Sequence, residues 1–83
     1  MKVTVKYFAS VREAMGLASE SRETAASTLG DLRDELLLVS SLHTSNLARG
    51  KAVRMALNQV MSDESARLTD GCEVAFFPPV TGG

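Results

Sequence analysis

The sequence has 83 residues, of which 45% are hydrophobic and 23% are charged, and its formal net charge is −1. These values predict one small domain spanning residues 1–83, with too little chain for a second core. The near-neutral charge gives no electrostatic basis for binding nucleic acid or an anionic membrane surface. No apolar run is long enough to cross a membrane, and the amino terminus lacks the apolar region of a signal peptide, so we expect a cytoplasmic protein.

The chain opens with an alternating stretch, residues 2–8. The apolar side carries Val3, Val5 and Tyr7, and the polar side carries Lys2, Thr4 and Lys6. A period of two residues predicts a β-strand with one wetter face.

A short helix is predicted next. Ser10 and Glu13 have the spacing of a capping box, and Gly16 can supply a left-handed stop. Residues 19–25 are polar and weakly patterned. Their position in the chain, more than their pattern, favours an edge strand there.

A longer helix is predicted over residues 29–39. Thr28 can cap it, with Asp31 at the third helical position. The apolar residues at helical spacing form one stripe: Leu29, Leu32, Leu36 and Val39. Leu37 and Leu38 widen this stripe, which indicates packing against a sheet face rather than a role with a cofactor or a membrane.

A polar connection follows over residues 40–51, with room for a short helical turn over residues 42–48. It contains the single histidine of the chain, His43. Because no second ligand accompanies it, we expect a surface histidine and no metal site.

The next segment has the pattern of a hairpin. Its first strand alternates through Val53, Met55 and Leu57. Asn58 and Gln59 suit a tight turn, and residues 60–61 begin a short partner strand. After the hairpin we expect a helical turn over residues 62–67.

The last strand is predicted over residues 74–77, directly after a turn at Asp70 and Gly71. These four residues are all apolar, without alternation. This pattern is typical of a strand that is buried on both faces near the centre of a sheet.

Residues 78–83 predict a projecting tail. Pro78 and Pro79 fix φ and exclude a helix, so the chain leaves the sheet in an extended form. From Phe77 the terminal carboxylate reaches at most about 20 Å, at roughly 3.3 Å per extended residue. That length is sufficient to enter the active site of another protein.

The end of the tail becomes slender. Val80 and Thr81 are β-branched and hold extended backbone, whereas Gly82 and Gly83 carry no side chain and fit a narrow passage. The competing interpretation is an inert, frayed terminus. A stiff segment followed by two bare glycines favours a terminus that is used chemically.

The order of the predicted elements is strand, helix, weak strand, long helix, hairpin and apolar strand. This order predicts an α+β fold of the β-grasp (ubiquitin-like) class, with a mixed sheet of four to five strands and the main helix packed on one face. In a β-grasp the first and last strands lie side by side and parallel in the middle of the sheet.

Few residues of the chain suit catalysis or cofactor binding. There is no Gly-rich nucleotide fingerprint, so we expect no ATP site and no bound cofactor in this chain. Cys72 has no second cysteine and only one histidine to pair with, so we interpret it as an ordinary strand residue. The acids Asp63, Glu64, Asp70 and Glu73 fit a solvated surface better than an acid–base pair. This elimination leaves the carboxylate of Gly83, which is an unreactive anion at neutral pH and needs external activation.

The ending of the chain, Leu68 to Gly83, resembles the small, sulfur-carrying subunit of molybdopterin synthase, in the ThiS-like group of ubiquitin-like proteins. Cys72 stands where that family usually has an acidic residue. Weaker agreement covers four shorter stretches, residues 7–9, 11–13, 28–33 and 56–59. Residues 40–48 match nothing in the family pattern.

The resemblance implies that the chain is a non-catalytic carrier. A separate adenylating enzyme would use ATP to activate Gly83, and a sulfur donor would then convert it to a thiocarboxylate. The tail would next enter the large subunit of the synthase, which uses the sulfur to build the dithiolene of molybdopterin.

The resemblance also points to Phe77, Met61 and Arg12 as residues that bind the partner. Phe77 and Met61 remain open to a second interpretation as core residues. Two further alternatives for the whole chain are a sulfur carrier for thiazole or cysteine synthesis and a ubiquitin-like modifier. A plain interaction module with an inert tail belongs to a different class and stays open.

Overall fold

The computed structural model describes residues 1–79. Within these residues the chain forms three helices and five strands in this order: β1 (Lys2–Tyr7), α1 (Ala9–Met15), β2 (Ser19–Glu23), α2 (Leu29–Leu37), α3 (Ser41–Leu47), β3 (Arg54–Leu57), β4 (Val60–Met61) and β5 (Glu73–Phe77). This is an α+β fold, as predicted.

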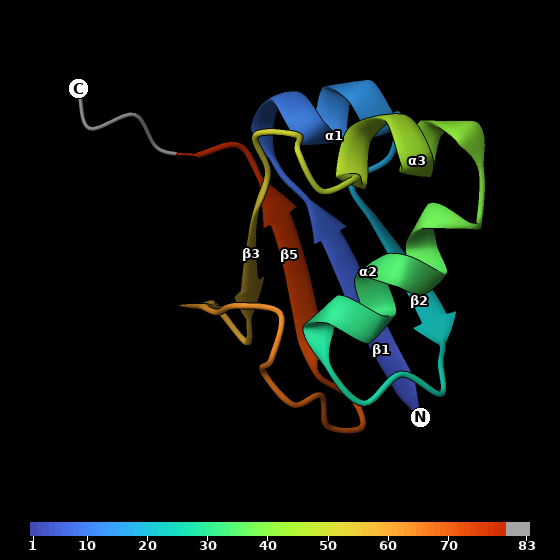
Figure 1. The fold of residues 1–83 in the computed structure, drawn as a ribbon, viewed down its shortest axis with the longest axis vertical. Coiled ribbons are helices and arrows are strands. Elements are labelled where there is room, and N and C mark those ends of the chain that lie inside the picture. The colour runs from blue at the N-terminus through green and yellow to red at the C-terminus, as the bar shows by residue number, and fades with distance from the viewer. Residues whose placement is uncertain (80–83) are drawn as a thin grey trace.

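The strands form one mixed sheet in the order β2-β1-β5-β3-β4 (Figure 1). β1 and β5 are parallel neighbours in its centre, with Val5 opposite Val74. The other neighbouring strands are antiparallel. The predicted pairing of the first and last strands is therefore confirmed, and so is the edge position of β2. The arrangement is a β-grasp.

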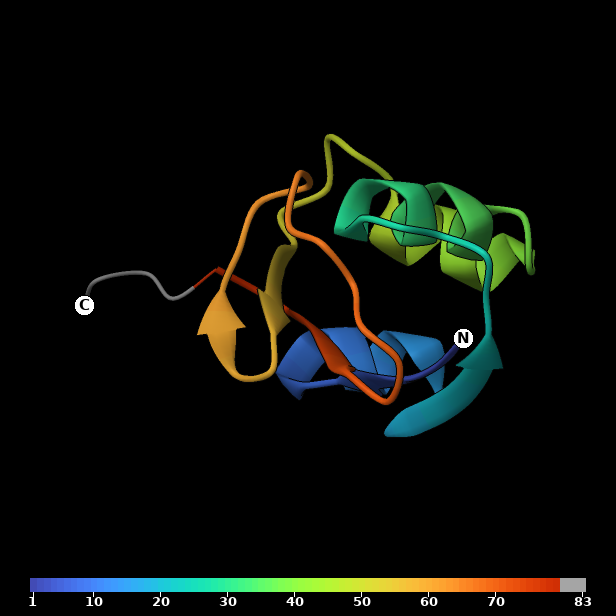
Figure 2. The ribbon, with the colours of Figure 1, turned by 90° about the horizontal axis from the view of Figure 1, so that it is seen from below.

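The helices cover one face of the sheet. α2 and α3 lie on the same side of it, and α1 lies at the end where β1 finishes (Figures 1 and 2). The core between the helices and the sheet includes fully buried residues of β1, α2 and β5: Val3, Val5, Leu29, Leu32, Leu36, Val74 and Phe76. The other face of the sheet has no helix over it among residues 1–79.

The predicted apolar stripe is right for its first three leucines and wrong for Val39. α2 ends at Leu37, and Leu38 is 88% exposed while Val39 is 40% exposed. The backbone N–H of Val39 donates to Leu36 O at 3.0 Å, which closes a turn that directs the chain into α3. The helix therefore ends before Val39 can reach the sheet.

The caps of the first two helices differ from one another. Thr28 caps α2 as predicted, because its Oγ1 accepts the N–H of Asp31 at 3.1 Å. The predicted capping box at Ser10 is wrong: α1 begins at Ala9, and its N-cap residue is Phe8, which makes no side-chain cap bond. Phe8 is held instead by its own N–H, which donates to Phe76 O in β5 at 3.1 Å.

The predicted helical turn over residues 62–67 is also wrong. The side chain of Asp63 accepts the N–H of Ser65 at 2.9 Å, a local bond that competes with helix formation. Beyond this turn the chain is extended beside the start of α2. The carbonyl oxygens of Glu64 and Ala66 accept the N–H groups of Gly30 and Leu29, both at 3.0 Å. The segment thus satisfies donors that the first turn of a helix leaves unpaired.

The predicted hairpin turn and the predicted short helical turn are both confirmed. Asn58 and Gln59 have φ values of 49° and 70°, as the favoured two-residue hairpin turn requires. The helical turn is the helix α3, for which Ser40 is the N-cap and accepts the N–H of His43 at 3.2 Å.

His43 is buried, so its predicted surface position is wrong. Only 7% of the residue is exposed. One ring nitrogen, Nε2, lies 2.9 Å from Glu20 Oε2, and the other, Nδ1, lies 2.7 Å from Ser40 Oγ. The same Glu20 oxygen accepts the hydroxyl of Tyr7 at 2.7 Å. This polar network joins β1, β2 and α3 inside the domain.

We expect Leu32→Ala to lower the free energy of unfolding by about 2–5 kcal/mol, because it leaves a cavity between α2 and the sheet. The matched control is Leu38→Ala, which removes the same atoms from an exposed position and should cost less than about 0.5 kcal/mol. Urea titrations followed by circular dichroism measure both losses. Equal losses would contradict the position of α2 described here.

Stability should fall in alkaline solution because of Tyr7. Burial, assisted by Glu20, raises the pKa of Tyr7 above its ordinary value of 10.0. The folded state therefore holds the phenolic proton more tightly than the unfolded state, so this contribution to stability is complete below pH 10 and is lost progressively above it. The chain has one tyrosine and no tryptophan, so phenolate absorbance reports Tyr7 alone.

The matched variant for this experiment is Tyr7→Phe. Its free energy of unfolding should lack the tyrosine-dependent part of the decline above pH 10. Phenolate formation at the ordinary pKa in the folded wild-type protein would show that the buried network does not form.

Candidate functional site

The candidate site begins where β5 ends. β5 lies between β1 and β3, with Phe76 opposite Tyr7 and Phe77 opposite Arg54. Phe76 is fully buried, and its ring stacks on that of Tyr7 with 6.0 Å between centroids. Hydrogen bonds from β5 to both neighbouring strands, together with the buried aromatic pair, therefore fix the position from which the chain leaves the sheet.

The strand cannot continue past Phe77, because a proline has no backbone N–H to donate to a neighbouring strand. Pro78 and Pro79 follow Phe77 and are half-buried, without regular secondary structure. The predicted reactive carboxylate of Gly83 lies outside the described residues. The same holds for the other tail residues named from the sequence, Val80, Thr81 and Gly82.

The face of the sheet opposite the helices is smooth near this point. Successive strand residues point to opposite faces, and Val5, Val74 and Phe76 point into the core. The residue row that points outward crosses four strands: Lys6, Ala75, Ala56 and Met61. The two alanines give this face a low, apolar centre.

Two large apolar side chains, Met61 and Phe77, border the alanines, together with the charged residues Lys6 and Arg54. Met61 is 63% exposed, and Phe77 is half-buried. Phe8 is 46% exposed and lies beside Phe77, since its N–H bonds to Phe76 O. We call these residues the outer-face patch: Phe8, Ala56, Met61, Ala75 and Phe77. Ala56 and Ala75 are only 7% and 5% exposed, so Phe8, Met61 and Phe77 provide most of the accessible area of the patch. Exposed apolar groups of this kind mark interaction surfaces on small domains.

The structure brings together two of the three residues that the resemblance marked as partner-binding, Phe77 and Met61, on one face. The core interpretation of Met61 is wrong, because most of this residue is exposed. The third, Arg12, is an exposed residue of α1 whose backbone N–H donates to Phe8 O at 3.2 Å. Arg12 therefore lies one helical turn from the patch.

Sequence reasoning missed Phe8. The signal was present, because Phe8 continues the outward positions of the first strand, where Lys2, Thr4 and Lys6 are all polar. A large aromatic residue at the end of a polar series is the kind of exception that marks a contact surface.

The other candidates have structural roles. Cys72 is 3% exposed and belongs to the hydrophobic core. Glu73 forms an ion pair with Lys6 at 3.1 Å, and Asp70 accepts the N–H of Lys2 at 2.8 Å. The hydroxyl and backbone N–H of Ser65 hold the pKa of Asp63 below its usual value.

Glu64, the remaining acid, is held by Arg49 and Arg33. Within residues 1–79, no three His, Cys, Asp or Glu side chains come together as a metal site would require. In the same residues, no helix has the length and apolar character needed to cross a membrane.

Two solved structures share the fold over the whole length of both chains. One is a complex of subunits 1 and 2 of the molybdopterin-converting factor from Helicobacter pylori, with a TM-score of 0.70 and 28% identity. The other is SAMP1 from Haloferax volcanii, with a TM-score of 0.81 and 24% identity. At that identity the second likeness establishes the fold alone.

Sequence relatives cover nearly the full chain. The molybdopterin synthase sulfur carrier subunit of Escherichia coli is 42% identical over 83 residues, which span 98% of this chain and 99% of the relative. The protein of the same name from Mycobacterium tuberculosis is 40% identical over 85 residues, spanning 100% and 99%. The sequence profile of the ThiS family matches residues 5–83. The chain therefore belongs to the ThiS family.

Proposed function

We propose that this protein is the sulfur carrier of molybdopterin synthase, and that Gly83 carries the sulfur as a thiocarboxylate. The observation that supports this most directly is the end of β5. A strand in the centre of the sheet stops at Phe77 beside the outer-face patch, and Pro78 and Pro79 lead away from it. The full-length relatives named as molybdopterin synthase sulfur carrier subunits support the same role.

The chemistry needs help from a second enzyme. At neutral pH a terminal carboxylate is an anion and resists attack by a sulfur nucleophile. An adenylating enzyme would transfer AMP from ATP to the Gly83 carboxylate and release pyrophosphate. A sulfur donor would then displace AMP, leaving a thiocarboxylate at Gly83. In this scheme ATP belongs to the adenylating enzyme, and the carrier chain itself holds no cofactor.

The role of the folded domain is to provide docking affinity. The outer-face patch would lie against the large subunit while the slim terminus enters its active site, where a positioned sulfur reacts with a cyclic pterin precursor. The Helicobacter pylori relative was solved as a complex of subunits 1 and 2, which supports an assembly of this kind. Bound aromatic residues such as Phe8 and Phe77 would carry much of the affinity.

Carriers for thiazole or cysteine synthesis and ubiquitin-like modifiers share this fold, so the fold does not discriminate between them. The relatives at 40% and 42% identity favour the molybdopterin role. An inert interaction module would use the patch and leave Gly83 unchanged. The chemical state of Gly83 therefore distinguishes an inert interaction module from every carrier.

Phe77→Glu should leave a folded monomer that assembles at least tenfold more weakly with the large subunit. A loss of that size corresponds to about 1.4 kcal/mol or more and follows from placing a charge in an apolar contact. Titration calorimetry measures assembly, and circular dichroism checks the fold. The matched control is Leu38→Glu, which places the same charge at an exposed residue of the α2–α3 junction.

The control variant should assemble like the wild type. If Phe77→Glu is unfolded, the residue is part of the core. If it is folded and assembles normally, the outer-face patch is not the docking surface.

Incubated with its adenylating enzyme, ATP and a sulfur donor, the intact protein should gain the mass of one sulfur in exchange for one oxygen. Deletion of Gly83 should abolish the gain, and so should extension by one residue, which moves the carboxylate by roughly 3.5 Å. Both variants should remain folded, because neither change touches a described strand or helix.

Cys72→Ser is the control for sulfur that is attached to the single cysteine instead of to Gly83. It should still gain the mass, and the modified peptide should be the C-terminal one. If intact protein with a competent activating enzyme never gains this mass, the carrier role fails and the inert interaction module becomes the better account.

A further inference from the structure

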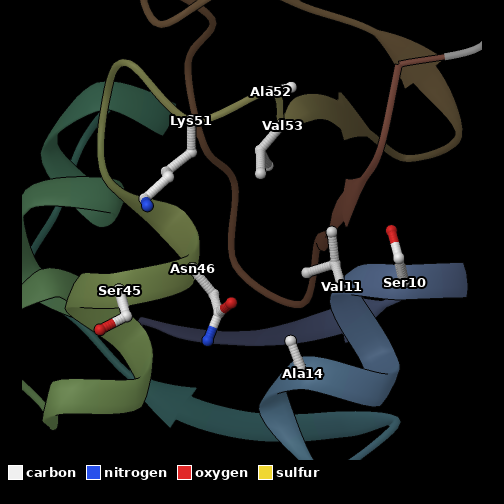
Figure 3. Close-up of a pocket in the computed structure, with 8 residues that line it drawn as sticks. All are labelled: Ser10, Val11, Ala14, Ser45, Asn46, Lys51, Ala52 and Val53. Atoms are coloured by element: carbon white, nitrogen blue, oxygen red, sulfur yellow. The ribbon is translucent and has the colours of Figure 1, made fainter.

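A pocket of about 320 Å³ opens outside the outer-face patch, between α1, α3 and the segment that precedes β3 (Figure 3). Its apolar lining comes from Val11, Ala14, Ala52 and Val53. Figure 3 shows Val11 and Val53 facing each other across it. No step of the proposed sulfur chemistry uses this pocket.

The polar lining of the pocket consists mainly of hydrogen-bond donors. Lys51, Ser10 and Ser45 are all exposed, and Lys51 extends from its segment toward α3 (Figure 3). Within residues 1–79, the Ser10 and Ser45 hydroxyls make no side-chain hydrogen bond and Lys51 makes no ion pair. Asn46 also lines the pocket, and its Nδ2 already donates to Leu42 O at 2.8 Å.

Two acids on neighbouring segments, Asp34 and Glu64, are already paired with arginines. Arg49, two residues before it, pairs with Asp34 and Glu64, and Arg33 also pairs with Glu64. Within residues 1–79 the ammonium group of Lys51 has no ion-pair partner, so it is available to a group from outside this chain. An unpaired lysine at a pocket favours an anionic ligand.

The apolar walls indicate which anion fits. A free phosphate has no carbon atoms to place against Val11, Ala14 and Val53. A glutamate or aspartate side chain has methylene groups for these walls and a carboxylate for Lys51. The combination therefore fits an acidic side chain better than an inorganic ion.

The location of the pocket indicates where such a side chain would come from. Ser10 and Val11 belong to the first turn of α1, directly after Phe8 of the outer-face patch. Lys51 lies three residues before Arg54, which is opposite Phe77. The pocket therefore lies at the same end of the sheet as Phe8 and Phe77, on the side of the helices.

We propose that this pocket receives a glutamate or aspartate side chain of the large subunit, with Lys51 as its charge partner. The proposal rests on the proposed function, because it takes the large subunit as the protein that covers this end of the domain. The contact adds a polar anchor beside the apolar patch, and so fixes the rotation of the carrier on its partner.

The first test compares two charge reversals in the full-length carrier. Lys51→Glu should weaken assembly with the large subunit at least tenfold at low ionic strength, and the loss should shrink as salt is added. The matched control is Lys2→Glu, which makes the same change at the opposite end of β1 (Figure 1). It should change the dissociation constant by less than about twofold.

The second test identifies the occupant. A carbodiimide joins an amine to a carboxylate that it touches, so treatment of the wild-type complex should link Lys51 to an Asp or Glu of the large subunit. Mass spectrometry of the linked peptides locates both ends. Lys51→Arg keeps the charge but cannot be linked, so it should assemble within about twofold of the wild type and lose this product.

The outcomes separate the two proposals. If the wild-type carrier does not assemble with the large subunit, the proposed function fails and this inference fails with it. If the wild type assembles but Lys51→Glu is no weaker than Lys2→Glu, this inference alone is overturned. The same conclusion follows if links form only at other lysines.

Discussion

The parallel pairing of β1 with β5 is the constraint on which the rest of the structure depends. It places the first and last strands of the chain side by side, in register from Thr4–Glu73 to Tyr7–Phe76. A parallel pair needs a long crossover, and here α1, β2, α2, α3 and the β3–β4 hairpin fill it. The pairing also sets Phe8 beside Phe77, so the outer-face patch exists only because the two ends of the chain meet.

Much of the fold could be predicted from local pattern, because local pattern reports the faces that become buried. The alternation of β1 and the spacing of Leu29, Leu32 and Leu36 both correspond to fully buried side chains. The failures arose where distant groups decide the conformation. A bond from Phe8 to β5 sets the start of α1, and α2 holds the segment after β4 extended. His43 is held inside the domain by Glu20, far away in sequence, which accepts a hydrogen bond from the Nε2–H group of its ring.

Some parts of the candidate site could likewise be predicted from local sequence, and others depend on contacts between distant segments. The proline-rich end of β5 followed from sequence. The sequence left Met61 open between a partner surface and the core, and Phe8 needed the register of two strands. The lysine pocket could not be predicted, because three separate segments build its walls. In the sequence, polar residues of a helix and a loop indicate only a solvated surface. Their position around one pocket becomes visible only in the folded structure.

The central position of β5 also has a consequence for how the chain matures. β5 is the last strand to leave the ribosome, yet it separates β1 from β3 in the sheet. Before it emerges, β1–β2 and β3–β4 are two antiparallel pairs with no hydrogen bonds joining them, and such isolated hairpins are marginal in water. The sheet of this domain is therefore completed only after β5 has been synthesised. A chain truncated before β5 lacks the strand that unites its sheet, so only chains that contain β5 can complete the fold.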